Sequence, residues 1–169
     1  IGFLFRKKGV NIPPFITGGG QESGMRSGTE PVPLIMGLKG AVEDLPNLNM
    51  QLEKQKALWS YAKDTLKSRC GAEINSPDDA LPYILNISLP GYRSETLLHF
   101  LEARSIFVSS GSACAKGHGS YVLKEMGLKP ALTDSALRIS FCRDNTENDI
   151  DLLADALCDT EKVLRKANI

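Results

Sequence analysis

Residues 136–141, Ala-Leu-Arg-Ile-Ser-Phe, have the alternation of a β-strand whose two faces differ. Leu137, Ile139 and Phe141 fall on one face, because successive side chains of a strand point to opposite sides. Arg138 and Ser140 fall on the other face. The apolar face predicts packing against helices. An arginine on the polar face can hold a carboxylate through two parallel N–H donors, or it can belong to an ordinary solvated surface.

Further strands and helices are predicted on both sides of this strand. Strands are expected at residues 72–75, 84–89 and 106–109, and helices at residues 48–69, 94–103, 120–126 and 146–166. Ser94 is expected to cap the second of these helices, and the start of the last has the pattern of a capping box. Strands interleaved with helices predict an α/β fold of the α+β kind, with helices on one face of a sheet.

The first 45 residues have a different character. Residues 1–6 are typical of the middle of a strand, residues 10–30 are rich in glycine and proline, and residues 32–45 are expected to form a helix. We therefore predict two parts, with residues 1–45 as the tail end of one domain and residues 46–169 as a second domain. The abrupt start without Met leads us to expect the C-terminal part of a longer chain.

Composition excludes several classes of protein. The formal net charge is zero, so the basic surface of a nucleic-acid-binding domain is not expected, and no apolar run approaches the length of a membrane span. The four cysteines form no C-x-x-C pair and only two histidines occur, which argues against a metal site. Their wide spacing favours a reducing compartment, which we take to be the cytoplasm. Cys70, Cys142 and Cys158 are interpreted as structural.

Cys114 is the exception among the cysteines, because it lies within Ser-Ser-Gly-Ser-Ala-Cys-Ala-Lys-Gly-His-Gly-Ser, residues 109–120. Small and flexible neighbours predict a mobile loop rather than a core position. A thiol there is either a fortuitous surface group or a nucleophile, whose thiolate Lys116 and His118 would stabilise.

Residues 18–29, Gly-Gly-Gly-Gln-Glu-Ser-Gly-Met-Arg-Ser-Gly-Thr, form a second candidate site. Glycines allow backbone N–H groups to converge on an anion, Arg26 adds charge, and Thr29 adds a hydroxyl just before an expected helix start. Pro31 is expected early in that helix. The segment is not a Walker loop and can equally be a flexible linker.

Together these stretches resemble the C-terminal part of a cysteine desulfurase, a pyridoxal-phosphate enzyme of the class V aminotransferase group. The matching stretches follow the family's order and are GFLFRKKGVNIPP (2–14), GGGQESGMRSGTE (18–30), LPYILNISLPG (81–91), SETLLHFLE (94–102), VSSGSACAKG (108–117), SYVLKEMGL (120–128), ALRISF (136–141) and TENDID (146–151). The resemblance implies a mixed, mostly antiparallel sheet covered by helices, as in the C-terminal domain of fold-type I pyridoxal-phosphate enzymes, preceded by the end of the large cofactor-binding domain.

The resemblance also implies roles for three residues. Cys114 matches the cysteine that attacks the substrate sulfur and carries a persulfide, and Arg138 matches the arginine that holds the carboxylate of L-cysteine. Thr29 matches the threonine that contacts the cofactor phosphate of the partner subunit in a homodimer. The implied activity converts L-cysteine to L-alanine and passes sulfur to acceptor proteins, such as a scaffold for iron–sulfur cluster assembly.

One family feature has no counterpart here. The lysine that binds pyridoxal phosphate covalently belongs before residue 1, so the chain by itself is expected to be inactive and the cofactor to be held mainly by the preceding part. Two other readings stay open. One is a related class V lyase or aminotransferase acting on selenocysteine or cysteine sulfinate. The other is a non-catalytic domain for dimerisation or acceptor binding.

Overall fold

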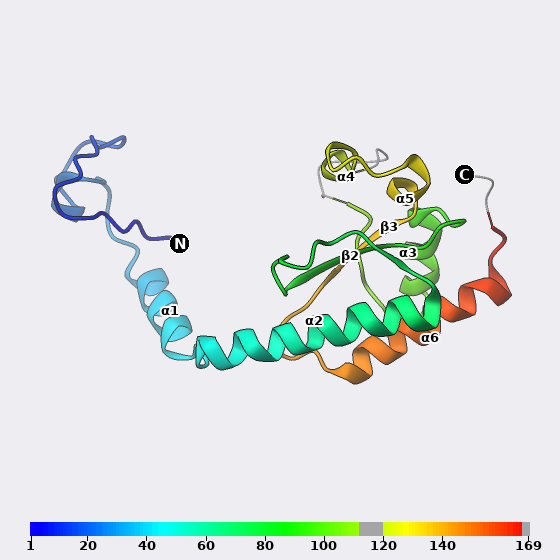
Figure 1. The fold of residues 1–169 in the computed structure, drawn as a ribbon. Helices are drawn as coiled ribbons and strands as arrows, with labels where there is room; N and C mark the ends of the chain where they lie inside the picture. Colours follow the sequence, from blue (N-terminus) through cyan, green and yellow to red (C-terminus); the bar gives the residue numbers. More distant parts are fainter. Residues whose placement is uncertain (112–119, 167–169) are drawn as a thin grey trace. The chain divides into compact units, whose positions relative to one another are not determined.

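The computed structural model describes residues 1–111 and 120–166, which form two compact units, Ile1–Asn47 and Leu48–Ile169. Figure 1 gives the positions of the helices and strands along the chain. Cys114, Lys116 and His118 lie outside the described residues.

The second unit is built on a three-stranded antiparallel sheet. Its strands are β1 (Glu73–Ile74), β2 (Ile84–Ser88) and β3 (Ala136–Ser140), in the order β1-β2-β3. In the register of β2 and β3, Leu85 pairs with Ile139, Ile87 with Leu137, and Asn86 with Arg138. Cross-strand partners share a face, so this register separates an apolar side from a polar side. The predicted α/β fold is confirmed, and among the described strands every pair is antiparallel.

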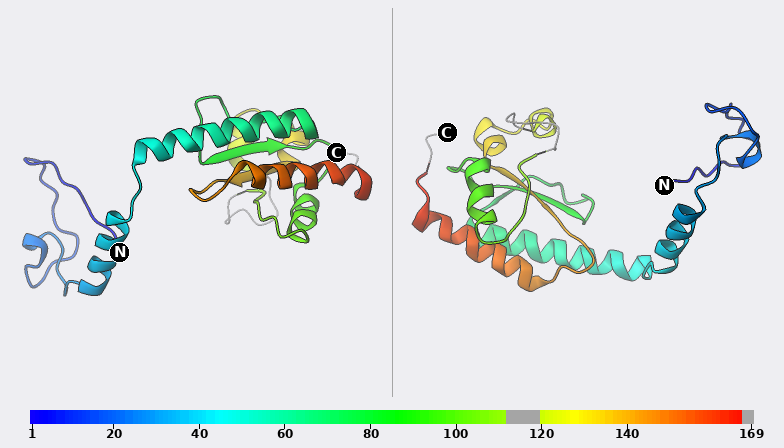
Figure 2. Two further views of the ribbon diagram at one scale, coloured as in Figure 1. Left: turned by 90° about the horizontal axis from the view of Figure 1, so that it is seen from below. Right: turned by 180° about the vertical axis from the view of Figure 1, so that it is seen from behind.

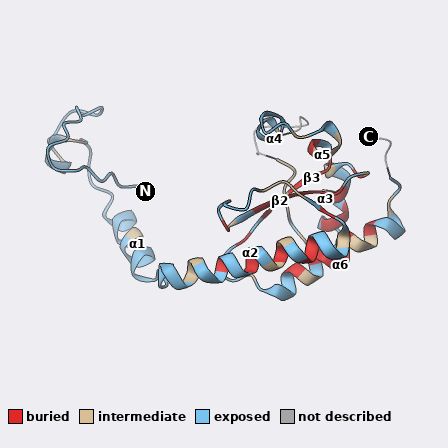
Figure 3. Ribbon diagram, in the orientation of Figure 1, coloured by how far each residue is buried: buried red, intermediate tan, exposed pale blue. Residues whose placement is uncertain are grey.

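Two long helices cover the apolar side of the sheet. Helices α2 (Leu48–Cys70) and α6 (Glu147–Val163) run side by side in both orientations of the ribbon, and α3 (Ser94–Glu102) packs against α6 (Figures 1 and 2). Buried positions concentrate where these elements meet (Figure 3). The largest fully buried apolar side chains are Leu66, Leu85, Ile87, Leu97, Leu101, Leu137 and Leu157. At the edge of this core, the Trp59 indole donates a hydrogen bond to the carbonyl of Ile84, over 3.0 Å.

The structure confirms the capping box predicted at the start of α6 but not the cap predicted for α3. Thr146 precedes α6, and its backbone N–H donates to the Asp149 carboxylate over 2.8 Å, which lowers the pKa of Asp149. The predicted cap at Ser94 is wrong, because Arg93 occupies the cap position and Ser94 is already helical. Short helices occur at α4 (Tyr121–Glu125) and α5 (Pro130–Asp134). The second of these was not predicted, since five residues are too few to show a helical period.

Two predicted strands are not formed. Residues 1–6 are exposed and lie outside any strand, because no described backbone segment is hydrogen-bonded alongside them. Residues 106–109 meet β3 only through a single bridge between Ser109 and Arg138. Their apolar composition reflects packing of Ile106 and Val108 against the core rather than a ladder of strand hydrogen bonds.

The first unit contains a 3-10 turn, η1 (Glu22–Gly24), and one α-helix, α1 (Val32–Glu43). No residue of α1 is buried, although the helix is largely apolar. Its exposed apolar side chains are Val32, Leu34, Ile35, Met36 and Val42. Over the part of the chain that the structure describes, none of the helices combines the length and the apolar character needed to cross a bilayer.

Candidate functional site

Arg138 lies in the middle of β3, between Asn86 of β2 and Ser109, and its backbone N–H and C=O are both hydrogen-bonded to Ser109. On one side it pairs with Asn86 of β2. On the other, the N–H of Ser109 donates to the carbonyl of Arg138 over 3.1 Å. A backbone fixed in this way gives the half-buried side chain a defined origin on the polar face of the sheet.

The polar side chains around Arg138 form hydrogen bonds with one another and with the backbone. The Asn75 amide donates to Asn86 Oδ1 and to Ser88 Oγ, both over 2.7 Å. Ser88 Oγ in turn donates to the carbonyl of Leu132 over 2.6 Å. Asn86 is the cross-strand partner of Arg138, so this network borders the arginine on the same face.

The Nε of the Arg138 guanidinium takes no part in that network. This nitrogen is buried and has no hydrogen-bond partner among the described residues. A buried donor left without an acceptor costs about 1–3 kcal/mol, and more when it belongs to a charged group. Arginine is always protonated in proteins, and a carboxylate is one of the ligands that match both its charge and its fork of donors.

The segment that contains Cys114 starts and ends at anchored residues. At its start, Ser109 is bonded to Arg138, and its hydroxyl donates to the carbonyl of Gly111 over 2.9 Å. At its end, Ser120 caps α4 by accepting a hydrogen bond from the N–H of Leu123 over 3.4 Å. The chain therefore enters this segment from the backbone partner of Arg138, five residues before Cys114.

Thr29 belongs to the first unit and is exposed. One residue earlier, Gly28 has a φ of +122°, and a Cβ there would lie 2.6 Å from Nη1 of Arg26. The same nitrogen donates to the carbonyl of Ser27 over 2.8 Å. Glycine at 28 therefore lets the guanidinium fold back beside the turn that presents the Thr29 hydroxyl. A cation and a hydroxyl in one turn are a donor set that suits a phosphate.

The start of α1 offers fewer free backbone N–H donors to an anion than a typical helix start. Pro31 occupies the cap position and Pro33 the first turn, and neither has an N–H. The N–H of Val32 bonds to the carbonyl of Glu30, and that of Leu34 to the carbonyl of Pro31. The expected cluster of unpaired backbone donors at this helix start is therefore not formed.

Three features of the site were not found by sequence reasoning. These are the bridge from Ser109 to Arg138, the network of Asn75, Asn86 and Ser88, and the position of Arg26 over Gly28. Only the second left a signal, because Asn86 and Ser88 alternate with apolar residues in β2 just as Arg138 and Ser140 do in β3. The described residues contain no group of three or more His, Cys, Asp or Glu side chains that could hold a metal ion.

Comparison with known proteins places this arrangement in a family. The chain is 36% identical to the cysteine desulfurase IscS of Rickettsia akari over 172 residues, covering 97% of this chain and 41% of the relative. It is 35% identical to a cysteine desulfurase of Nostoc sp. (strain PCC 7120) over 170 residues, covering 98% of this chain and 42% of the relative. A solved structure of a NifS-like protein matches with a TM-score of 0.74 and 35% identity, covering 94% of this chain and 41% of that one.

This chain thus spans about two fifths of the length of these relatives. The family model described as aminotransferase class-V matches residues 1–153. The chain belongs to the aminotransferase class-V family.

Proposed function

We propose that this chain is the C-terminal part of a cysteine desulfurase, with Arg138 as the carboxylate-binding residue and Cys114 as the nucleophile. The observation that carries the proposal is the buried, unpaired Nε of Arg138 beside the start of the cysteine segment. The similarity to proteins named cysteine desulfurase supports the same choice of substrate, L-cysteine.

In the proposed reaction Arg138 acts first and Cys114 second. Arg138 binds the carboxylate of L-cysteine and fixes its orientation. The Cys114 thiolate then forms a bond to the substrate sulfur while the carbon–sulfur bond breaks. The electron pair of the broken bond stays with the three-carbon remainder, which takes up a proton and leaves as alanine. Pyridoxal phosphate, when bound, supplies the electron sink for this reaction.

The persulfide left on Cys114 would pass its outer sulfur to an acceptor. An acceptor thiolate attacks that sulfur, and the Cys114 thiolate leaves. We propose an acceptor protein such as a scaffold for iron–sulfur cluster assembly. The cysteine pattern supports a cytoplasmic location.

We assign residues 1–45 to the end of the cofactor-binding domain and residues 46–169 to the C-terminal domain. The exposed apolar side chains of α1 support a further contact, which we take to be the partner subunit of a homodimer together with the rest of that domain. Thr29 and Arg26 would then contact the phosphate of the cofactor bound by the partner subunit. The local donor set supports this role.

Replacing Thr29 by Ala in the full-length protein should raise the Kd for pyridoxal phosphate about 2–10-fold, the expected effect of losing one exposed hydrogen bond. Absorbance titration of the cofactor-free protein measures this Kd. Thr17→Ala, at another exposed threonine of the same unit, is the matched control and should leave the Kd unchanged. An unchanged Kd in Thr29→Ala would remove Thr29 from the cofactor site.

The test of the proposed function is product analysis. The full-length protein, given L-cysteine and a reducing thiol, should release alanine and sulfide in equal amounts, whereas residues 1–169 alone should release neither. Selenide from selenocysteine with little sulfide from cysteine would favour the selenocysteine enzyme, and sulfite from cysteine sulfinate would favour the sulfinate enzyme. No product from any of the three would favour a non-catalytic domain.

A further inference from the structure

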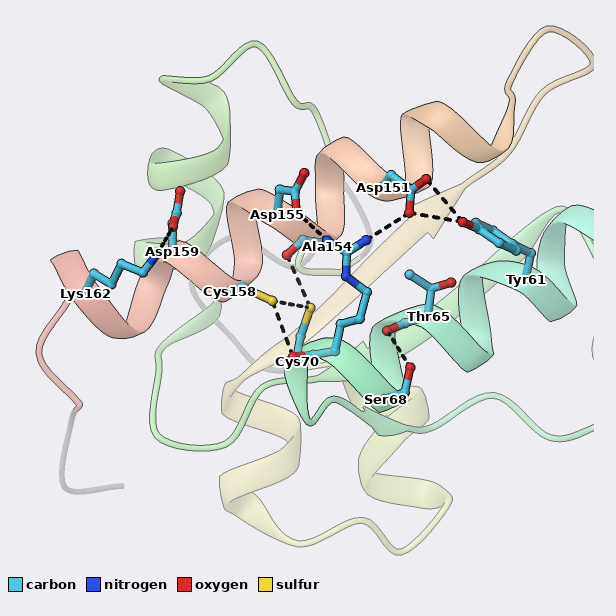
Figure 4. A network of polar contacts seen from close by, with 11 residues as sticks. Tyr61, Thr65, Ser68, Cys70, Asp151, Ala154, Asp155, Cys158, Asp159 and Lys162 are labelled. Carbon is cyan, nitrogen blue, oxygen red and sulfur yellow. Dashed lines mark hydrogen bonds and ion pairs between the residues drawn. The ribbon is translucent and has the colours of Figure 1, made fainter.

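Two cysteines that the proposed reaction does not use lie in direct contact. Cys70 is the last residue of α2, and Cys158 lies in α6, 88 residues further along the chain. Their Sγ atoms are 3.3 Å apart. In Figure 4 the two side chains point toward one another across the packed helices. The interpretation of both as separate structural cysteines therefore misses their pairing.

The surroundings of the two sulfurs are well ordered by polar contacts. The thiol of Cys70 donates to the carbonyl of Ala154 over 3.3 Å, and that of Cys158 to the carbonyl of Arg69 over 3.4 Å. The Arg69 side chain crosses from α2 to α6, where it pairs with Asp151 over 2.9 Å and also with Asp155. These contacts, drawn in Figure 4, hold the two helices in register at the cysteines.

The thiol of Cys70 is held in its protonated form. Burial, together with the hydrogen bond to Cys158, raises the pKa of Cys70 to about 12, so Cys70 stays protonated at neutral pH. We therefore take Cys158 as the sulfur of the pair that reacts first.

Cys70 and Cys158 both line a cleft of about 420 Å³, whose wall includes Tyr92 and Lys166. The Tyr92 hydroxyl is buried and has no hydrogen-bond partner among the described residues. Cys142, by contrast, is exposed.

We propose that Cys70 and Cys158 are a redox-active pair that a hydroperoxide, entering through this cleft, oxidises to a disulfide joining α2 to α6. The Cys158 thiolate attacks the terminal peroxide oxygen, the O–O bond breaks, and the alkoxide or hydroxide that leaves takes up the proton lost by the Cys158 thiol to form an alcohol or water. The sulfur of Cys70 then attacks the sulfenic acid on Cys158, and the displaced hydroxide takes the proton of Cys70 to form water. The two thiols lose two electrons in all, and the peroxide gains them.

The geometry favours this product over more oxidised forms. The sulfurs must approach by roughly 1 Å to reach the disulfide bond length of about 2.05 Å. A resolving thiol already in contact captures the sulfenic acid before a second peroxide can react. Because the bond closes a long loop, the oxidised protein should melt at a temperature roughly 5–15 °C higher than the reduced protein.

The test treats the 169-residue chain with hydrogen peroxide, blocks remaining thiols, and digests it with trypsin without reduction. Cleavage after Arg69, Arg93, Arg143 and Lys162 places Cys70 in peptide 70–93 and Cys158 in peptide 144–162. We expect these two peptides to be linked, with a loss of two hydrogen masses that dithiothreitol reverses. Cys142→Ser is the matched control and should leave the link intact.

Single replacements test the order of the steps. Cys70→Ser should leave Cys158 to accumulate as a sulfenic acid that dimedone labels, whereas Cys158→Ser should leave Cys70 unlabelled. Absence of the link between peptides 70–93 and 144–162 in the wild-type chain would overturn the proposal. So would links made mainly through Cys142, or equal peroxide reactivity of Cys70, Cys142 and Cys158. None of these outcomes depends on desulfurase activity.

Discussion

Replacing Cys114 by Ser in the full-length protein should lower the rate of alanine formation from L-cysteine by about 10³-fold or more, because the step that removes the sulfur loses its nucleophile. A serine hydroxyl is far less ionised at neutral pH than a thiol and forms no persulfide. Binding of L-cysteine should be nearly unchanged, since in the proposed site Arg138 would still hold the carboxylate. Single-turnover kinetics with L-cysteine separate these two effects.

The matched control for this variant is Cys142→Ser. Cys142 is exposed and follows β3 in the sequence, so its loss should leave alanine formation intact. Mass spectrometry of the wild-type protein after one turnover should find the additional sulfur on Cys114. Finding it on Cys70, Cys142 or Cys158 instead, or finding full activity in Cys114→Ser, would contradict the assignment.

The sheet was predictable because its signal is local. Alternation in residues 136–141 identified the apolar and polar faces, and the register with β2 places Leu137 against Ile87 and Arg138 against Asn86 accordingly. The start of α6 was equally local, since Asp149 lies three residues after Thr146 and accepts its N–H. The strands predicted at residues 1–6 and 106–109 are not formed, because what decides them is not local. A strand depends on the backbone beside it, and composition does not say whether one is there.

The candidate site was only partly predictable for the same physical reason. Residue types made Arg138 and Cys114 candidates, because a strand arginine and a glycine-flanked thiol are unusual locally, and the family resemblance implied their roles. The bridge from Ser109 to Arg138 links residues 29 positions apart, and the contact between Cys70 and Cys158 links residues 88 apart. Neither pairing leaves a periodic pattern in the sequence. Such contacts arise only when the helices and strands pack.

Replacing Arg138 by Ala should lower kcat/KM for L-cysteine by about 10²–10³-fold, and Arg138→Lys by about 10–100-fold. Lysine keeps the charge but loses the planar fork, so it can satisfy only part of the carboxylate. The carboxylate is bound both before and during the reaction. Loss of the contact should therefore appear mainly as a higher KM. Arg165→Ala, at an exposed arginine, is the matched control and should change neither constant.

A stability measurement distinguishes binding from a structural role. In the absence of substrate, the buried Nε of Arg138 has no partner among the described residues, so the folded state bears the cost of that unpaired donor. Arg138→Met keeps an unbranched chain and removes the donor. It should leave the free energy of unfolding unchanged or raise it by about 1 kcal/mol, while kcat/KM falls. If the arginine served the fold instead, urea denaturation of Arg138→Met would show a loss of about 2 kcal/mol or more. That result, or an unchanged kcat/KM, would remove Arg138 from the substrate site.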